Sequence, residues 1–182
     1  MSEKESAMNR ATDRTAPATE LDTRFSSPGA EAVPWSRAEE LLTAAELFWI
    51  STVRPDGRPH VTPLIGLWYE GALHFTTGEL ERKALNLAAN PEVVLTTGAN
   101  AWAEGTDLVV EGTAARITDT ARLRDLAKAF EEKYGAVWHF EVRDDAYFHG
   151  GGGAAMVFAV APRVAFGFAK GEPFGQTRWR FS

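Results

Sequence analysis

The sequence predicts an α+β domain built on an antiparallel β-barrel with two or three flanking helices. Three observations support this prediction. About seven or eight short segments are rich in β-branched and aromatic residues. Turns that contain Gly or Pro join several of these segments. Two or three segments between them carry apolar residues at helical spacing. Many short strands with intercalated helices are typical of a barrel in an α+β domain.

The composition limits the class of protein. The chain has 182 residues, enough for one domain with a substantial core. Its net charge of −6 argues against general nucleic-acid binding. It contains no cysteine, which excludes disulfides and thiolate chemistry and fits a reducing compartment. No apolar run is long enough to cross a bilayer, and the N-terminus lacks a signal-peptide core. We therefore expect a cytoplasmic protein with no membrane partner.

The chain divides into a tail and a folded domain. Residues 1–34 are polar and show no sustained periodicity, so they are predicted to be disordered because they bury too little apolar area to offset chain entropy. The folded domain is predicted over residues 35–182. Ser36 followed by Glu39 is a capping box, which predicts the start of the first helix.

A hairpin and a strand–turn–strand–helix unit come next. Leu47–Val53 is β-branched and aromatic, and a Pro- and Gly-containing turn at residues 54–57 makes the strand near His60 its antiparallel partner. The Glu70-Gly71 turn leads into a second strand, and a helix follows it up to Pro91. The remaining strands are predicted over residues 92–97, 107–117 (with a bulge or bend at Gly112), 155–160, 163–169 and 176–181.

Three further segments are predicted after that helix. Residues 98–106 form a loop. Leu123, Leu126 and Phe130 lie at helical spacing and indicate another helix. Residues 136–154 are predicted to form a long irregular stretch that ends in glycines and serves as a mobile flap.

The start of the helix after the second strand is the first candidate site. A helix N-terminus offers unpaired N–H donors and a partial positive charge to an anion. The hydroxyls of Thr76 and Thr77 precede this helix, while Arg82 and Lys83 add two cations that favour a phosphate over a carboxylate. Asn86 lies one turn beyond Arg82 on roughly the same face. The alternative is a strand end, a helix cap and a solvated helical face.

Two other segments are candidates with structural alternatives. Pro63 removes a backbone donor, so its strand is interrupted or lies at an edge, where free backbone groups could bond to a flat heterocycle. The alternative is a kinked barrel strand. Trp179, flanked by arginines, belongs either to a terminal strand with solvated cations or to the cover of a site, across a subunit boundary. The four histidines form no close ligand pair, so we predict no metal site.

The sequence resembles the pyridoxamine 5′-phosphate oxidase-like flavin and deazaflavin oxidoreductases, which have an FMN-binding split β-barrel. The resemblance extends from about Trp35 to Phe181. It is carried by the hairpin LFWISTVRPDGRPHVTPL, by FTTGELERKALNL and by the closing TRWRF. It implies a homodimer that binds FMN or coenzyme F420 between its subunits. The substrate-phosphate residues of true pyridoxamine phosphate oxidases are not found, so that vitamin activity is not implied.

The resemblance also implies roles for individual residues. The flavin phosphate and ribityl chain would be held by Thr76, Thr77, Arg82 and Lys83, and Asn86 matches a position common in relatives with K-x-x-N-L. The isoalloxazine ring would lie along the preceding strand, at His60, Val61, Thr62, Pro63 and Leu64. The implied reaction is hydride transfer between the cofactor and a small organic substrate. The alternatives are a flavin or F420 carrier without turnover and a haem-binding relative on the same barrel, which would need an axial ligand.

Overall fold

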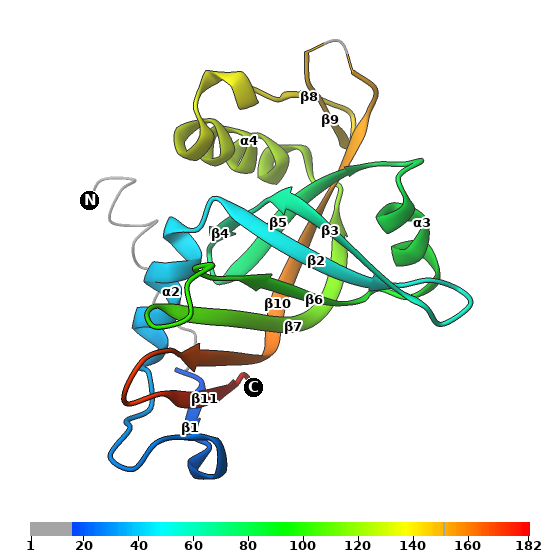
Figure 1. Ribbon diagram of the computed structural model, residues 1–182. Helices are drawn as coiled ribbons and strands as arrows, with labels where there is room; N and C mark the ends of the chain where they lie inside the picture. The colour runs from blue at the N-terminus through cyan, green and yellow to red at the C-terminus, as the bar shows by residue number, and fades with distance from the viewer. Residues whose placement is uncertain (1–15, 151) are drawn as a thin grey trace.

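The computed structural model describes residues 16–150 and 152–182 and confirms the predicted α+β class (Figure 1). Within these residues, eleven strands form one antiparallel sheet, flanked by three α-helices. The strands are β1 (Ala18–Leu21), β2 (Leu47–Val53), β3 (Pro59–Ile65), β4 (Leu67–Tyr69), β5 (Ala72–Gly78), β6 (Glu92–Thr97), β7 (Thr106–Ile117), β8 (Glu141–Arg143), β9 (Ala146–Phe148), β10 (Ala155–Ala169) and β11 (Gly175–Arg180). The helices are α2 (Trp35–Ala44), α3 (Arg82–Ala89) and α4 (Thr120–Tyr134), with two 3₁₀ turns, η1 (Thr23–Phe25) and η2 (Ala136–Trp138).

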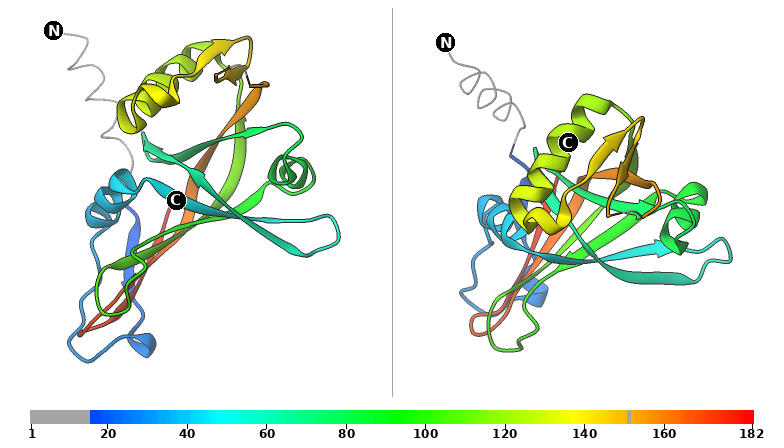
Figure 2. Two further views of the ribbon diagram at one scale, coloured as in Figure 1. Left: turned by 45° about the horizontal axis from the view of Figure 1, so that its top comes forward. Right: turned by 90° about the horizontal axis from the view of Figure 1, so that it is seen from above.

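The sheet curls into a barrel that is split along one side. The main strand order is β1-β11-β10-β7-β6-β2-β3, and β5 pairs separately with β10 and β4. No ladder joins β3 to β5, so the sheet is not closed. The chain crosses between these two strands at Gly66, immediately before β4. The views in Figure 2 place α3 beside the β2–β3 hairpin, and α4 with β8 and β9 over another end of the sheet.

The longest strand, β10, runs through a segment that was predicted as two strands. Its register shifts between Pro162 and Val164, opposite Gly112 of β7. The extra residue of this irregularity therefore lies on β10, directly opposite Gly112, where the sequence predicted a bulge or bend in β7. Gly112 is needed for close approach, because a Cβ there would lie 2.5 Å from the carbonyl oxygen of Ala161.

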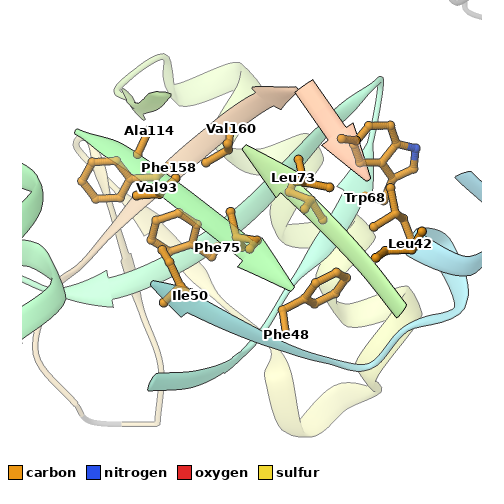
Figure 3. Close-up of a cluster of buried hydrophobic side chains, with 14 of the residues drawn as sticks. Leu42, Phe48, Ile50, Trp68, Leu73, Phe75, Val93, Ala114, Phe158 and Val160 are labelled. Carbon is orange, nitrogen blue, oxygen red and sulfur yellow. The ribbon is translucent and has the colours of Figure 1, made fainter. Parts of the chain in front are cut away.

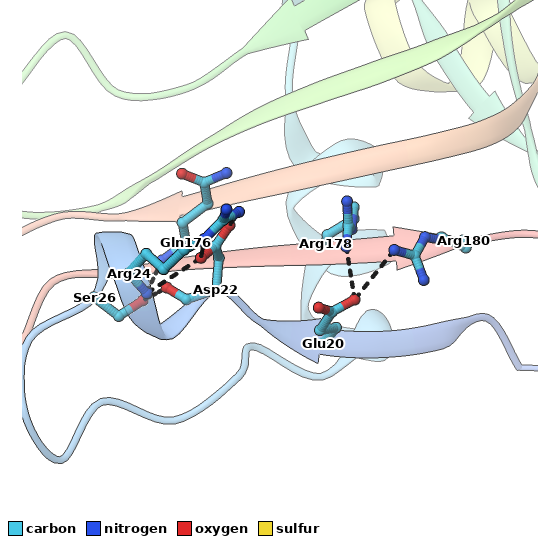
Figure 4. Close-up of polar contacts among 7 residues, drawn as sticks. All are labelled: Glu20, Asp22, Arg24, Ser26, Gln176, Arg178 and Arg180. Atoms are coloured by element: carbon cyan, nitrogen blue, oxygen red, sulfur yellow. Dashed lines mark hydrogen bonds and ion pairs between the residues drawn. The ribbon is translucent and has the colours of Figure 1, made fainter.

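Part of the predicted N-terminal tail is ordered. β1 pairs antiparallel with β11, and the Glu20 carboxylate forms ion pairs with Arg178 and Arg180 (Figure 4). The prediction of disorder was therefore wrong for residues 16–34, because β11 offers this segment an unpaired strand edge. Residues 1–15, which also belong to the predicted tail, lie outside the described residues.

The start of α2 is set by packing instead of capping. The helix begins at Trp35, its N-cap is Pro34, and no side chain caps it, so the predicted capping box at Ser36 and Glu39 does not form. The Trp35 ring packs edge-on against Trp68, Trp179 and Phe181 with centroid distances of 4.8–5.8 Å. Burial of this large ring fixes the helix position.

Alternation along the strands gives the sheet an inward and an outward face. Across the strands, directly paired residues share a face. One inward row contains Thr62, Ile50, Leu95, Val110, Ala165 and Trp179. The neighbouring outward row contains Pro63, Trp49, Thr96, Val109, Phe166 and Arg178. Side chains of the inward face from β2, β5, β6, β7 and β10 form the main core (Figure 3).

A second core lies beneath α4. Leu123, Leu126 and Phe130 of the helix are fully buried, as their spacing predicted. Residues 136–154, predicted as an irregular flap, contain η2 and the β8–β9 hairpin. Phe140 and Tyr147 are buried against α4, which explains why η2 and the β8–β9 hairpin are ordered.

The end of α4 holds the two ends of the β2–β3 hairpin. Lys133 Nζ donates to the carbonyl oxygens of Ala45 at 2.6 Å and Gly66 at 3.0 Å. The Tyr134 hydroxyl lies 2.8 Å from the carbonyl oxygen of Glu46. In the part of the chain that the structure describes, no helix is both long and apolar enough to cross a membrane.

Candidate functional site

The start of α3 holds a buried cation and a carboxylate. Lys83 lies in the first turn of α3, and only 9% of its side chain is exposed. Its ammonium pairs with the carboxylate of Glu81, the residue immediately before the helix. The backbone N–H of Gly78 donates to the same carboxylate at 2.7 Å. One of the two predicted cations, Lys83, and the amide of Gly78 therefore converge on one anion, which belongs to the chain itself.

The environment of Glu81 keeps its carboxyl ionised. Burial raises the pKa of this group. Hydrogen bonds from Lys83 and Gly78, the charge of Lys83 and the nearby Thr77 hydroxyl lower the pKa by more than burial raises it. The net effect is a pKa below the ordinary value of 4.5. Near neutral pH the site therefore contains an anion bound to an ammonium and an amide.

The two predicted cations occupy different environments. The Arg82 side chain is exposed, whereas Lys83 is buried. Both contribute to the positive potential near His60, whose pKa is lowered by burial and then by the charges of Arg54, Lys83 and Arg82. Arg54, at the end of β2, was not among the predicted site residues. These groups form a cationic region beside α3.

Asn86 and Thr52 link α3 to the barrel next to this region. Asn86 is fully buried, and its Nδ2 donates to the hydroxyl of Thr52 at 2.9 Å. The Thr52 hydroxyl lies 3.4 Å from His60 Nδ1. Three buried atoms nearby on the inward side of β2, β3 and α3 have no hydrogen-bond partner among the described residues: Asn86 Oδ1, Thr62 Oγ1 and Arg54 Nε. Such atoms are uncommon in proteins and can mark the place of an absent ligand or water.

Alternation separates the side chains of the strand predicted to lie along the flavin ring. His60, Thr62 and Leu64 are partly buried on the inward side of β3, whereas Val61 and Pro63 are exposed on the outward face. β3 is the last strand of the main order, so Pro63 lies at an edge, as one of the two interpretations predicted. The five residues can share a site only through their backbone groups.

Alternation also separates the two predicted hydroxyls on β5. Thr77 is buried and its hydroxyl donates to the carbonyl oxygen of Gly78 at 3.3 Å, while Thr76 is half-buried and faces the other side of the strand. Only Thr77 therefore lies on the buried side, where its hydroxyl helps to lower the pKa of Glu81. The sequence pair Thr-Thr cannot place both hydroxyls on one ligand, because successive side chains of a strand point to opposite faces.

Trp179 belongs to the core, which favours its interpretation as part of a terminal strand over its interpretation as the cover of a cofactor site. Its side chain is completely buried, and Nε1 donates to the carbonyl oxygen of Val33 at 3.1 Å. The inward row of the sheet contains Trp179, whereas Arg178 and Arg180 face Glu20. A ring enclosed by its own protomer cannot cover a site on a neighbouring subunit.

The histidines lie in four separate environments. His74 is buried, and burial followed by the charge of Arg122 lowers its pKa to about 4. His139 pairs with Glu131. His149 stacks on Trp138 and bonds through Nδ1 to the carbonyl oxygen of His139 at 3.1 Å. Within residues 16–150 and 152–182, no group of three His, Asp or Glu could hold a metal ion.

Sequence reasoning missed three residues of this region: Thr52, Arg54 and Glu81. Thr52 and Arg54 continue the inward alternation of Phe48 and Ile50 along β2, which is the signal that could have found them. Glu81 directly precedes the Arg-Lys pair, but its sequence position does not say which way its carboxylate turns.

Comparisons with known proteins identify the architecture. The family model for pyridoxamine 5′-phosphate oxidase matches residues 35–163. No curated protein matches the sequence significantly. Among solved structures, the conserved hypothetical protein Rv2991 from Mycobacterium tuberculosis is 16% identical with a TM-score of 0.60, and the match covers 75% of this chain and 85% of that one.

Two further structural neighbours carry haem in their names. The haem storage protein HutZ from Vibrio cholerae is 18% identical with a TM-score of 0.55, covering 70% of this chain and 88% of that one. A haem-binding protein from Mycobacterium smegmatis is 15% identical with a TM-score of 0.60, covering 76% of this chain and 56% of that one. At these identities the likeness establishes a shared fold.

Proposed function

The chain belongs to the pyridoxamine 5′-phosphate oxidase family, and on that premise we propose that it is an oxidoreductase that binds FMN or coenzyme F420. In this proposal it transfers hydride between the cofactor and a small organic substrate. One observation carries the proposal: a buried ammonium and a backbone N–H converge on a single anion at the end of β5. The resemblance assigns this segment to the flavin phosphate.

The residues of the region fit the phosphate-bearing arm of such a cofactor. Lys83 and the exposed Arg82 supply positive charge, and the Gly78 amide supplies a directed donor. Nearby, Arg54 Nε can donate, whereas Asn86 Oδ1 can only accept. A ribityl chain with several hydroxyls can satisfy both kinds of atom. The backbone of residues 61–64, on the edge strand β3, would contact the ring.

The bound flavin or deazaflavin would supply the hydride chemistry, while the protein positions the reactants and excludes water. Cationic groups of Arg54, Arg82 and Lys83 would fix the anionic end and so set the depth at which the ring lies. Residues 98–106 and 136–154 would border the substrate. No side chain is assigned as a general acid or base.

The outward sheet face supports the second part of the proposal, a homodimer with the cofactor at the subunit interface. Trp49, Val61 and Leu47 are 46–51% exposed on adjacent strands, Val53 extends this apolar surface along β2, and Phe168 lies on the same outward face on β10. Contiguous apolar surface of this kind is typical of interfaces. Its occupant is proposed to be a second copy of the chain, because a two-fold dimer can cover the same patch on both subunits.

Titration of the purified protein with FMN and with F420, followed by fluorescence, tests the cofactor. The double variant R82A/K83A should bind the cofactor at least about tenfold more weakly, the effect of losing charge-assisted contacts. Unchanged affinity would reject the phosphate assignment. Tight binding without cofactor-dependent reduction of any quinone-like substrate would instead indicate a carrier.

Haem binding is the second candidate, favoured by the two haem-named neighbours and by His149. This side chain is exposed, and Nδ1 faces the His139 carbonyl, which leaves Nε2 as the nitrogen with a free lone pair. On mixing with haemin, an axial His149 ligand would give a Soret band that H149A loses. The variant H139A is the matched control. Absence of the band would reject haem binding, and the flavin proposal would then be the one candidate function still standing.

A further inference from the structure

Glu81 uses the donors that an incoming phosphate would need. Its carboxylate accepts from the Gly78 N–H at 2.7 Å and pairs with the Lys83 ammonium. In this state the charge of Lys83 is already neutralised, so a second anion can reach these donors only if the carboxylate leaves.

The carboxylate can leave without disturbing the core. Half of the Glu81 side chain is exposed (51%), whereas the Lys83 side chain beneath it is 9% exposed. Glu81 is the N-cap residue of α3, but its side chain makes no capping hydrogen bond to the helix. It lies over Gly78 instead. A rotation about its side-chain bonds would carry the carboxylate into solvent and leave α3 intact.

We propose that Glu81 is an internal competitor that the ligand phosphate must displace, and that it thereby selects phosphate esters over carboxylates. This inference rests on the proposed function of the same site. A carboxylate ligand would exchange one carboxylate for another and would still lose its freedom of motion on binding. A phosphate group carries up to two charges and three acceptor oxygens, so it gains more from the same ammonium and N–H groups.

The test compares FMN with riboflavin, which has the same ring and ribityl chain without the phosphate. Wild type, E81Q, E81A and E79A are titrated by fluorescence quenching. Removal of the competitor should tighten FMN binding by about tenfold in E81A and leave riboflavin binding unchanged. E79A is the matched control, because Glu79 is an exposed carboxylate two residues earlier and its loss changes the net charge equally.

Three results would overturn the inference. E79A could tighten FMN binding as much as E81A, which would indicate a general charge effect. E81A could tighten riboflavin and FMN equally. Weaker FMN binding in both E81A and E81Q, with unchanged thermal unfolding, would show that Glu81 positions Lys83 for the ligand. E81Q retains the shape of the side chain, so it separates loss of charge from loss of packing.

A second measurement is independent of the cofactor. The amide N–H signal of Gly78 is followed by NMR while inorganic phosphate is added. It should saturate at a phosphate concentration about tenfold lower in E81A than in wild type, and equal titrations would overturn the inference. If neither FMN nor F420 binds any variant, wild type and E81A can still differ in the phosphate titration. In that case the proposed function is rejected, and the inference that Glu81 competes with phosphate is supported.

Discussion

The side-chain amide of Asn86 donates to the hydroxyl of Thr52 at 2.9 Å, and both residues are almost completely buried. This bond joins the third position after Lys83 on α3 to the inward face of β2. It therefore fixes the helix that carries the candidate anion site against the hairpin that carries Arg54 and His60. The geometry of the site depends on this contact between two elements that are 34 residues apart in sequence.

A double-mutant cycle can measure this bond. N86A and T52A should each lower the free energy of unfolding, and the double variant should lose less than the sum by about 0.5–1.5 kcal/mol. Chemical denaturation provides the values. The variant N90A, which loses an exposed contact to the Glu92 N–H, should not couple to T52A. Additive losses for N86A and T52A would show that the contact is energetically unimportant.

Trp179 should matter for stability and not for ligand recognition. W179A should lower the free energy of unfolding by about 3–5 kcal/mol, because it leaves a large cavity in the main core. W179F retains much of the packing, so at a temperature where it is folded its cofactor affinity should equal that of wild type. A loss of cofactor affinity in W179F without a loss of stability would show that Trp179 contributes to the cofactor site.

His74 should make the fold sensitive to acid. Its folded pKa is about 4, below the ordinary 6.5, because of burial and the charge of Arg122. Between these pH values the unfolded chain binds the proton and the folded chain does not, so stability falls as the pH decreases from 6.5 to 4. H74F should remove this part of the pH dependence. Chemical denaturation of both proteins across that range measures the effect. If another group is responsible, the unfolding free energies of H74F and wild type will depend on pH in the same way.

Lys133 should have the same kind of effect at alkaline pH. Burial lowers its folded pKa to about 8 from 10.5, although the charge of Glu46 opposes the shift. Between these values the folded protein releases a proton that the unfolded chain retains, so this group makes stability rise with pH. The difference in unfolding free energy between wild type and K133M should therefore change across pH 8–10.5. A constant difference would contradict the prediction.

The proposed dimer interface can be tested with matched valines. Val61 on β3 is 51% exposed on the outward face, and Val137 in η2 is 70% exposed elsewhere. V61E places a charge in the proposed interface and should convert the dimer to a monomer in light scattering. V137E should leave the dimer unchanged. A monomeric wild type, or dissociation by V137E alone, would reject this face.

Local sequence rules predicted much of the fold. Gly71 and the residue before it form the expected tight turn with positive φ values, at 74° and 47°, and β2 forms over Leu47–Val53, as its β-branched and aromatic residues predicted. β1 was missed because its partner, β11, lies about 160 residues away, as the pairing of Thr19 with Trp179 illustrates. Pairing over such a distance leaves no local pattern in a polar segment.

The sequence predicted the cations of the candidate site. It did not predict which side chains of the strands face that site. Lys83 lies where the spacing placed it, at the start of α3. Whether Thr76 or Thr77 would face it depends on the register of β5 against β10, which a short sequence segment does not determine. In the same way, the sequence left open whether Trp179 covers a site or belongs to a terminal strand, and the structure places it in the core. The occupation of the anion site by Glu81 depends on a side-chain rotamer, which has no sequence signal.

The length of β10 is constrained more strongly than that of any loop that borders the site. This strand forms ladders with β5, β7, β9 and β11. Deletion of one residue from its middle would turn one half of the strand over relative to the other, so that the side chains of that half would face the opposite side of the sheet from their paired neighbours. The offset beyond Pro162 is the one irregularity in its pairing with β7. Natural insertions and deletions should therefore accumulate in the connections and spare β10.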